Sequence, residues 1–325
     1  MNNYWQKYDD IYEELCSIKD LVIEVNKTSE PYLNESIDYL ASTGGKMLRP
    51  AFFMIASRFG TGKLTKEELV KRAAVIEMLH LATLIHDDII DEAKLRRGKP
   101  SIQAKYSKEY AVYMGDYLFT QCFVMMAEQS YSPENLKRAA RAISRVCLGE
   151  MLQSKFRYET SITTRDYLKI ISGKTAALFA MSLGIGAYES GAEEAVAKTL
   201  GRIGYNVGMA FQIKDDLLDY KGDDEVVGKE TKLDILRGFY TLPIIRGLKT
   251  DSKGQIEKLL SSVDMGDAEV KALIAITKGC GALDEAEELA GKYTVRAMKH
   301  LESLPEGEGK DVLMDIIPKL LNREH

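Results

Sequence analysis

Acidic residues gather in the stretch HLATLIHDDIIDEAKLRRGKPS, residues 80–101, within an otherwise apolar pattern. If this stretch is helical, Asp87 and Asp91 stand at positions i and i+4 on one face, with Asp88 beside them. Carboxylate oxygens are the ligands that Mg²⁺ and Ca²⁺ prefer in proteins. The spacing therefore predicts a site where two carboxylates hold one divalent cation.

Two arginines follow these aspartates in the segment RRGKPS, where Gly98 and Pro100 indicate that the helix has ended. Arg96 and Arg97 carry guanidinium groups, which bind phosphate oxygens through paired hydrogen bonds. A metal site followed by two such groups favours a ligand that carries phosphate.

A second acidic cluster of the same spacing lies far downstream, in FQIKDDLLDYKGDDEVVGKETK. It consists of Asp215, Asp216 and Asp219, and Lys229 lies in the charged loop beyond it. Two facing clusters would repel strongly in a low-dielectric interior unless divalent cations and a polyphosphate lay between them. We therefore expect a polyphosphate that both clusters bind through metal ions.

A turn with two glycines, Gly44 and Gly45, precedes Lys46 and Arg49. Helix amino termini attract phosphate, so this turn could cradle an anion, and a solvated helix start is an equally good interpretation from these residues alone. His80 is ambiguous in the same way, because a lone histidine on an apolar helix face is more often a hydrogen-bonded core residue than a ligand.

Glu77 and His80 also match half of the Glu-x-x-His signature of di-iron helical bundles. That alternative needs a second such pair. The other histidines, His86, His300 and His325, have no Glu three positions before them, so the di-iron interpretation is discounted.

Helices must position these side chains, because apolar residues recur at helical spacing and no alternating strand pattern persists. Gly115 and Asp116 are expected to start a helix over residues 117–127. The tripeptide of residues 173–175 interrupts another helical region, which either a kink that exposes Lys174 to a cavity or close helix packing would explain. With 7 Pro and no flexible linker, residues 1–325 are expected to form one all-α domain.

Charge and hydropathy limit the partners and the location. The net charge is −5 and no block of five basic residues occurs, which argues against nucleic-acid binding. The first residues, MNNYWQKYDDIYEELC, are charged where a secretory signal needs an apolar run. The longest apolar run, residues 175–188, is shorter than the roughly 20 residues of a membrane span. We expect a cytoplasmic protein whose product could still partition into a membrane.

Six blocks in order, GGKMLRP, HLATLIHDDIID, RRGKPS, GKTAALF, FQIKDDLLD and GKETKLD, resemble the motif series of the medium- and long-chain trans-polyprenyl diphosphate synthases. These enzymes condense isopentenyl diphosphate with an allylic diphosphate. The motifs span residues 44–243, and the resemblance continues more weakly to the end. It implies an all-α helical bundle around a central cavity, Mg²⁺ as the cofactor and a homodimer.

The resemblance also implies roles for the residues that match these blocks. The candidate ligands of Mg²⁺ are Asp87, Asp91, Asp215 and Asp219. The candidate cations at the allylic leaving group are Arg96, Lys174 and Lys229. The candidate catalytic residues are Lys174, Thr175, Gln212 and Asp88. Thr175 and Gln212 offer oxygens to the developing carbocation, and Asp88 lies near the metal ligands. The candidates for binding isopentenyl diphosphate are Lys46, Arg49, His80 and Arg97. Glu150 and Gln153 resemble a family pair but are given no catalytic role.

One position departs from the family pattern. Family members often carry a lysine after the Gly of the block DILRGFYTLP, where this chain has Phe239. The leaving-group site is therefore expected to have one cation fewer.

Product length is expected to depend on Ala82 and Thr83, which precede Asp87 by five and four positions, about one helical turn of 5.4 Å. Short-chain relatives often place an aromatic residue at this level. Alanine and threonine should let the growing tail pass, which predicts hexaprenyl to octaprenyl products. The alternatives are a farnesyl or geranylgeranyl diphosphate synthase, in which Ala82 is small only because two helices pack there.

Two other classes of protein are compared with this interpretation. A terpene cyclase also uses aspartate-rich helices, but it binds one diphosphate and has no need for the four candidates for isopentenyl diphosphate. A regulatory subunit usually lacks one acidic cluster, and both are intact here. The chain could also be the catalytic subunit of a heteromeric synthase.

Overall fold

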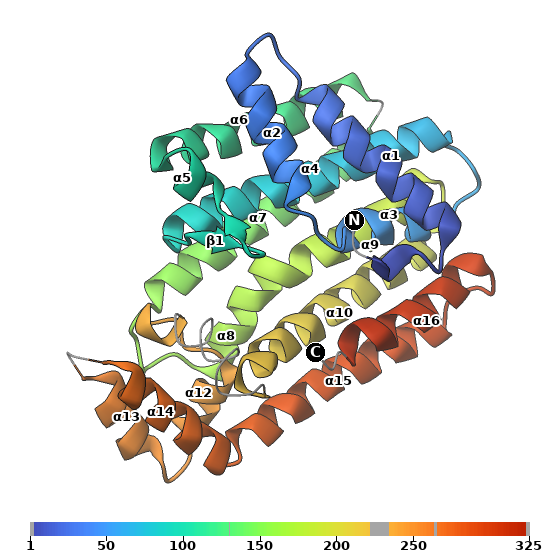
Figure 1. Ribbon diagram of the computed structural model, residues 1–325. Helices are drawn as coiled ribbons and strands as arrows, with labels where there is room; N and C mark the ends of the chain where they lie inside the picture. The colour runs from blue at the N-terminus through green and yellow to red at the C-terminus, as the bar shows by residue number, and fades with distance from the viewer. Residues whose placement is uncertain (1–2, 130, 222–233, 263–264, 323–325) are drawn as a thin grey trace. The chain divides into compact units, whose positions relative to one another are not determined.

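The computed structural model describes residues 3–129, 131–221, 234–262 and 265–322 (Figure 1). The chain divides into two compact units. The first comprises residues 1–139, 181–201 and 307–309, and the second comprises residues 140–180, 202–306 and 310–325. Almost all regular structure in the described ranges is helical, which confirms the predicted all-α fold. The predicted single domain stays a prediction.

Helix α4 is the central element of the first unit. It packs against α1, α3 and α6. A capping box at its amino end, in which Thr65 and Glu68 bind each other's backbone N–H groups, fixes where it starts. The helices that begin in this unit are η1 (Asn3–Trp5), α1 (Asp9–Val25), α2 (Pro31–Ser42), α3 (Leu48–Ser57), α4 (Lys66–Ile90), α5 (Ile102–Lys105), α6 (Lys108–Glu128) and α7 (Pro133–Lys155).

A short hairpin follows α4 and reverses the chain. Its strands are β1 (Leu95–Arg96) and β2 (Lys99–Pro100), paired antiparallel. The two residues between them, Arg97 and Gly98, have φ of 52° and 76°. Such left-handed pairs form the tight turns that suit a two-residue hairpin loop. The segment RRGKPS thus turns back after the helix, as its Gly and Pro predicted.

Helix α6 starts earlier than the sequence suggested. It runs from Lys108, so Gly115 lies inside it and the predicted start at residues 115–116 is wrong. The glycine serves packing instead, because a Cβ atom there would lie 2.4 Å from Nε2 of His86 on α4. A glycine can indicate either a close approach of two helices or the start of a helix, and the sequence alone does not distinguish them.

The second unit contains the segment around residues 173–175. Here α8 (Thr164–Ile171) passes into a π-helical turn, η2 (Ser172–Ala176), and then into α9 (Ala177–Glu189). Close helix packing is confirmed, since a Cβ atom on Gly173 would lie 2.3 Å from the carbonyl oxygen of Arg145. The helix also widens at this turn, and the exposure of Lys174 to a cavity stays a prediction. The other helices are α10 (Glu194–Lys221), α12 (Leu242–Gly247), α13 (Lys253–Leu260), α14 (Asp267–Gly279), α15 (Ala282–Glu302) and α16 (Glu308–Leu321).

One helical stretch of the described residues, Thr164–Glu189, is long and apolar enough to cross a membrane by length and composition. It is longer than the apolar run read from the sequence because α8, η2 and α9 are continuous. Within its apolar window, 83% is buried inside the protein, as in the core helix of a soluble protein.

Candidate active site

The first acidic cluster lies at the carboxyl end of α4. Asp87 is in the last turn, and Asp91 is the residue that caps the helix, with its N–H donating to the Asp87 carbonyl at 2.8 Å. The two side chains are therefore one turn apart on the same face and are both half-buried. The spacing predicted from the sequence is confirmed.

Asp88 is engaged by an arginine. This carboxylate is buried, and Nε of Arg96 donates to its two oxygens at 2.9 Å and 2.8 Å. The hairpin directs Arg96 back at the helix end, as predicted, and the group it meets in the described residues is Asp88. The charge of this buried aspartate is thereby neutralised by a cation.

Arg49 and His80 form a second arrangement in the same unit, with Nη1 of Arg49 2.9 Å from Nε2 of His80. Burial and the nearby arginines lower the pKa of His80 well below its usual value, so the ring is neutral and Nε2 can accept this hydrogen bond. Burial also lowers the pKa of Arg49 to about 10, while the Glu77 carboxyl opposes that shift.

Arg97 and Lys46 join this arrangement through the glycine turn. A Cβ atom on Gly45 would lie 2.5 Å from Nη1 of Arg97, so this guanidinium packs directly against the glycine. Nζ of Lys46 lies 5.5 Å from the centre of the Tyr4 ring, and the Lys46 carbonyl accepts a hydrogen bond from the Trp5 indole. Arg49, His80 and Arg97 are close enough to influence one another's protonation, and Lys46 lies next to the glycine that Arg97 covers.

Glu77 belongs to this arrangement and was not identified from the sequence as part of it. Burial raises its pKa, while Arg49 and Arg97 oppose the shift. Its Oε2 is buried without a hydrogen-bond partner among the described residues. Two guanidinium groups and a neutral histidine face this single carboxyl, so the arrangement has excess positive charge. Such a site suits an anion.

The two residues assigned to product length lie inside α4. Ala82 is fully buried, and the hydroxyl of Thr83 donates to the His80 carbonyl at 2.8 Å. Full burial of Ala82 is what the helix-packing alternative requires, and the chain-length role of both residues stays a prediction.

In the second unit, three predicted residues form one hydrogen-bonded chain. The Thr175 hydroxyl donates to Oε1 of Gln212 at 2.6 Å, and Nε2 of Gln212 donates to Oδ1 of Asp216 at 2.9 Å. Tyr167 on α8, which the sequence did not point to, donates its hydroxyl to Oδ2 of Asp216 at 2.6 Å. The π-helical turn η2 and helix α10 thus hold these side chains in one continuous arrangement.

Asp216 and Asp215 have opposite surroundings although they are adjacent on α10. Asp216 is buried, and burial raises its pKa to about 7 despite the hydrogen bonds from Tyr167 and Gln212. Asp215 is exposed. The side chain of Asp219 and all of Lys229 lie outside the described residues.

Lys174 is held by two residues of α7. Its ammonium donates to Oε2 of Glu150 and to Oε1 of Gln153, both at 3.1 Å. Glu150 and Gln153 were given no catalytic role, and in the structure they fix the position of this cation.

The position that departs from the family pattern has a cation near it. The guanidinium of Arg157 lies 5.5 Å from the centre of the Phe239 ring, and its Nε donates to the Arg237 carbonyl at 2.7 Å. Phe239 lacks the positive charge of the family lysine, and the guanidinium of Arg157 places a positive charge beside the Phe239 ring.

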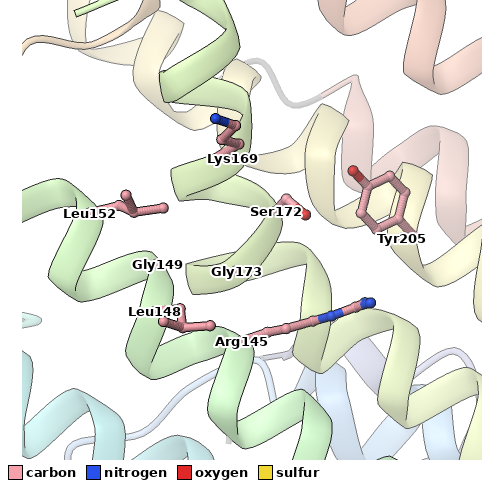
Figure 2. Close-up of a pocket in the computed structure, with 8 residues that line it drawn as sticks. All are labelled: Arg145, Leu148, Gly149, Leu152, Lys169, Ser172, Gly173 and Tyr205. Atoms are coloured by element: carbon pink, nitrogen blue, oxygen red, sulfur yellow. The ribbon is translucent and has the colours of Figure 1, made fainter.

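A cavity of about 410 Å³ opens beside η2 in the second unit (Figure 2). None of the residues predicted for the site lines it, although Gly173 on its wall precedes Lys174. The eight lining residues are Arg145, Leu148, Gly149, Leu152, Lys169, Ser172, Gly173 and Tyr205.

Among the described residues, no group of three or more His, Cys, Asp or Glu side chains comes together to hold a metal ion. Asp88 and Asp216 already bind protein groups. The carboxylates that fit a hard divalent cation are Asp87 and Asp91, which share a helix face, and the exposed Asp215.

The chain is similar to known proteins over most of its length. A family model described as polyprenyl synthetase matches residues 30–277. Component 2 of the heptaprenyl diphosphate synthase of Geobacillus stearothermophilus is 36% identical over 319 residues, which cover 98% of each chain.

Solved structures match over nearly the whole chain. A geranylgeranyl pyrophosphate synthase from Lactobacillus brevis has a TM-score of 0.93 and 33% identity, covering 98% of this chain and 99% of that one. A polyprenyl synthase from Caulobacter crescentus, in complex with calcium and isoprenyl diphosphate, has a TM-score of 0.88 and 29% identity, covering 99% of this chain and 97% of that one.

Proposed function

We propose a reaction for this chain from the premise that it belongs to the polyprenyl synthetase family and is a prenyl diphosphate synthase. It condenses isopentenyl diphosphate with an allylic diphosphate, uses Mg²⁺, and releases an all-trans polyprenyl diphosphate of hexaprenyl to octaprenyl length. The observation that carries the proposal is the positively charged arrangement of Arg49, His80 and Arg97 in the unit that also holds the carboxylates of α4.

That arrangement binds the diphosphate of the nucleophile. Arg49 and Arg97 offer planar donors to phosphate oxygens, and neutral His80 fixes the direction of Arg49. Because two guanidinium groups face one carboxyl, that of Glu77, and His80 is neutral, the arrangement keeps its attraction for the incoming anion. A terpene cyclase has one diphosphate to bind and gives no reason for this second anion site.

The acidic clusters serve the allylic diphosphate. Asp87, Asp91, Asp215 and Asp219 would hold Mg²⁺, which would supply positive charge to neutralise the departing diphosphate. Arg96, Lys174 and Lys229 are the cations proposed for this leaving group. Arg96 is held by Asp88, and Lys174 is held by Glu150 and Gln153. Thr175 and Gln212 hold oxygen atoms in fixed directions, which is how a protein stabilises a developing cation without reorganising.

The product length rests on Ala82 and Thr83. Relatives of this chain carry names for different lengths, heptaprenyl in one and geranylgeranyl in another, so the family does not decide it. Small residues one turn before Asp87 favour the longer products. Replacing Ala82 with Tyr should shorten the main product to geranylgeranyl or less while the first condensation continues. An unchanged product ladder from the folded variant would contradict this role.

A second copy of the chain is the partner we propose for α6. This helix exposes four large apolar side chains, Val112, Tyr113, Phe123 and Val124, with exposed fractions of 39–73%. They recur at helical spacing along one face, and a homodimer would cover them. Changing Tyr113 and Phe123 to Lys should produce monomers in sedimentation velocity.

We also propose that the protein works in the cytoplasm and that its long product partitions into the membrane.

The alternative is a catalytic subunit that needs a different partner, and the name of the relative from Geobacillus stearothermophilus, component 2, favours it. Incubating the purified chain with Mg²⁺, labelled isopentenyl diphosphate and farnesyl diphosphate, and separating the products by length, decides between them. We expect prenyl products of six to eight isoprene units from the chain alone. Absence of any elongation by the folded chain would favour the heteromeric alternative.

A further inference from the structure

Tyr167 contacts the second acidic cluster from a different helix. It is buried on α8, and its hydroxyl donates to Oδ2 of Asp216 on α10 at 2.6 Å. The other oxygen, Oδ1, accepts from Nε2 of Gln212 at 2.9 Å. Both oxygens of this carboxylate are thus bound by protein donors, so its orientation is fixed by two groups that come from separate helices.

The direction of the Gln212 amide follows from that carboxylate. Because the NH₂ group donates to Asp216, the carbonyl oxygen Oε1 is the atom that meets Thr175, and the Thr175 hydroxyl donates to it at 2.6 Å. A hydroxyl has one hydrogen and two lone pairs. The hydrogen of Thr175 is therefore committed to Gln212, and its oxygen can present only lone pairs to a neighbouring cationic group.

We propose that Tyr167 is a positioning residue for the condensation, which rests on the function proposed above. Its hydroxyl holds Asp216 against Gln212 and so fixes the direction of the whole hydrogen-bonded chain from Tyr167 to Thr175. Without that hydroxyl the carboxylate can turn on its side chain and release the amide, which can then rotate and present its NH₂ group to Thr175. The threonine hydrogen would point elsewhere, and the fixed dipole that faces the developing cation would be lost.

The substitution Tyr167→Phe tests this, because it removes one oxygen atom and keeps the ring. The matched control is Tyr293→Phe on α15, a buried tyrosine of the same unit whose hydroxyl makes no hydrogen bond with any described residue. Losing a hydrogen bond to a carboxylate should lower kcat by about 10- to 100-fold. The KM for isopentenyl diphosphate should stay unchanged, and Tyr293→Phe should match the wild type.

A purely structural role for Tyr167 would not depend on Thr175, so the two substitutions are also combined. If Tyr167 acts through the chain, then in a Thr175→Val background Tyr167→Phe should change single-turnover rates by less than about twofold. The same large factor in both backgrounds, or a Tyr167→Phe variant that behaves like the control, would overturn the inference. An inactive wild type would instead count against the proposed function, and the inference would fall with it.

Discussion

The two acidic clusters share one spacing and are held in different ways. Asp88 and Asp216 occupy the same place in the motif, as the second of paired aspartates, and both are buried. The first is bound by the guanidinium of Arg96, and the second by a hydroxyl and an amide. The spacing of a motif thus predicts which carboxylates are present, and the tertiary contacts decide what compensates their charge.

This difference extends to the surroundings of each cluster. The first unit adds Arg49 and Arg97 beside α4, so charged groups dominate there. Neutral donors bind Asp216 among the described residues of the second unit, and burial raises the pKa of this carboxyl to about 7. We infer that the groups around His80 bind an anion by charge and that the groups around Asp216 orient dipoles.

The largest effects are expected at Asp87 and Asp215, each the first aspartate of its cluster and a proposed metal ligand. Asp87→Ala and Asp215→Ala should each lower kcat by about 10³-fold or more, because each removes part of the metal site, and circular dichroism should show an intact fold. The control is Asp38→Ala on the exposed side of α2. Near-normal turnover in either variant, or in the wild type without divalent metal, would contradict the metal assignment.

Substitutions that affect one substrate only test which diphosphate each site binds. Arg97→Ala should raise the KM for isopentenyl diphosphate by about 10- to 100-fold, because it removes a charge-assisted contact. Lys174→Ala should chiefly lower kcat. Steady-state kinetics with each substrate varied in turn separates these effects. If Arg97→Ala altered only the KM for the allylic substrate, the two diphosphate sites would be reversed.

The lowered pKa of His80, which the arginines of the first unit help to cause, should make the free energy of unfolding depend on pH. Histidine titrates near 6.5 when unfolded, and the folded pKa of His80 is well below that, so in the interval between them only the unfolded chain binds the proton. This group should therefore lower the free energy of unfolding by up to about 1.4 kcal/mol for each pH unit below about 6.5. Urea unfolding of the wild type and His80→Gln over this range measures it. A difference between the two proteins that does not vary with pH would refute it.

The smallest expected effect is a change in unfolding free energy, which distinguishes the ionic contact of Asp88 from the neutral contacts of Asp216. Arg96→Gln keeps a donor near Asp88 and should cost about 1 kcal/mol of unfolding free energy at low salt, and less at high salt, where charges are screened. Tyr167→Phe should cost about 1 kcal/mol at either salt concentration, because a neutral donor is lost. Urea unfolding at two salt concentrations checks both. Equal salt sensitivity would remove the distinction between the clusters.

The sequence was sufficient where a feature depends on local spacing. The position of Asp87 and Asp91 on one helix face follows from four residues of helix, and the turn at Arg97 and Gly98 follows from turn chemistry. The interruption before Thr175 was visible as a glycine in a helical pattern. Each of these depends on neighbours in the chain.

Contacts between distant segments could not be predicted in this way. Tyr167 meets Asp216 across 49 positions, and nothing in its local pattern distinguishes it from a core tyrosine. Glu77 did have a signal, its place three residues before His80, but that spacing pointed to iron rather than to the arginines it faces. The helix start predicted at Gly115 was wrong because the side chain that packs against this glycine, His86, lies on another helix.

The central claim is that the first unit binds the diphosphate of isopentenyl diphosphate with its own cations. Isothermal titration of isopentenyl diphosphate into the metal-free protein tests it most directly, with Arg49→Ala as the variant. We expect binding by the wild type without divalent metal, and a Kd raised about 10- to 100-fold by Arg49→Ala. Binding that disappears when metal is removed, or that Arg49→Ala leaves unchanged, would contradict the account.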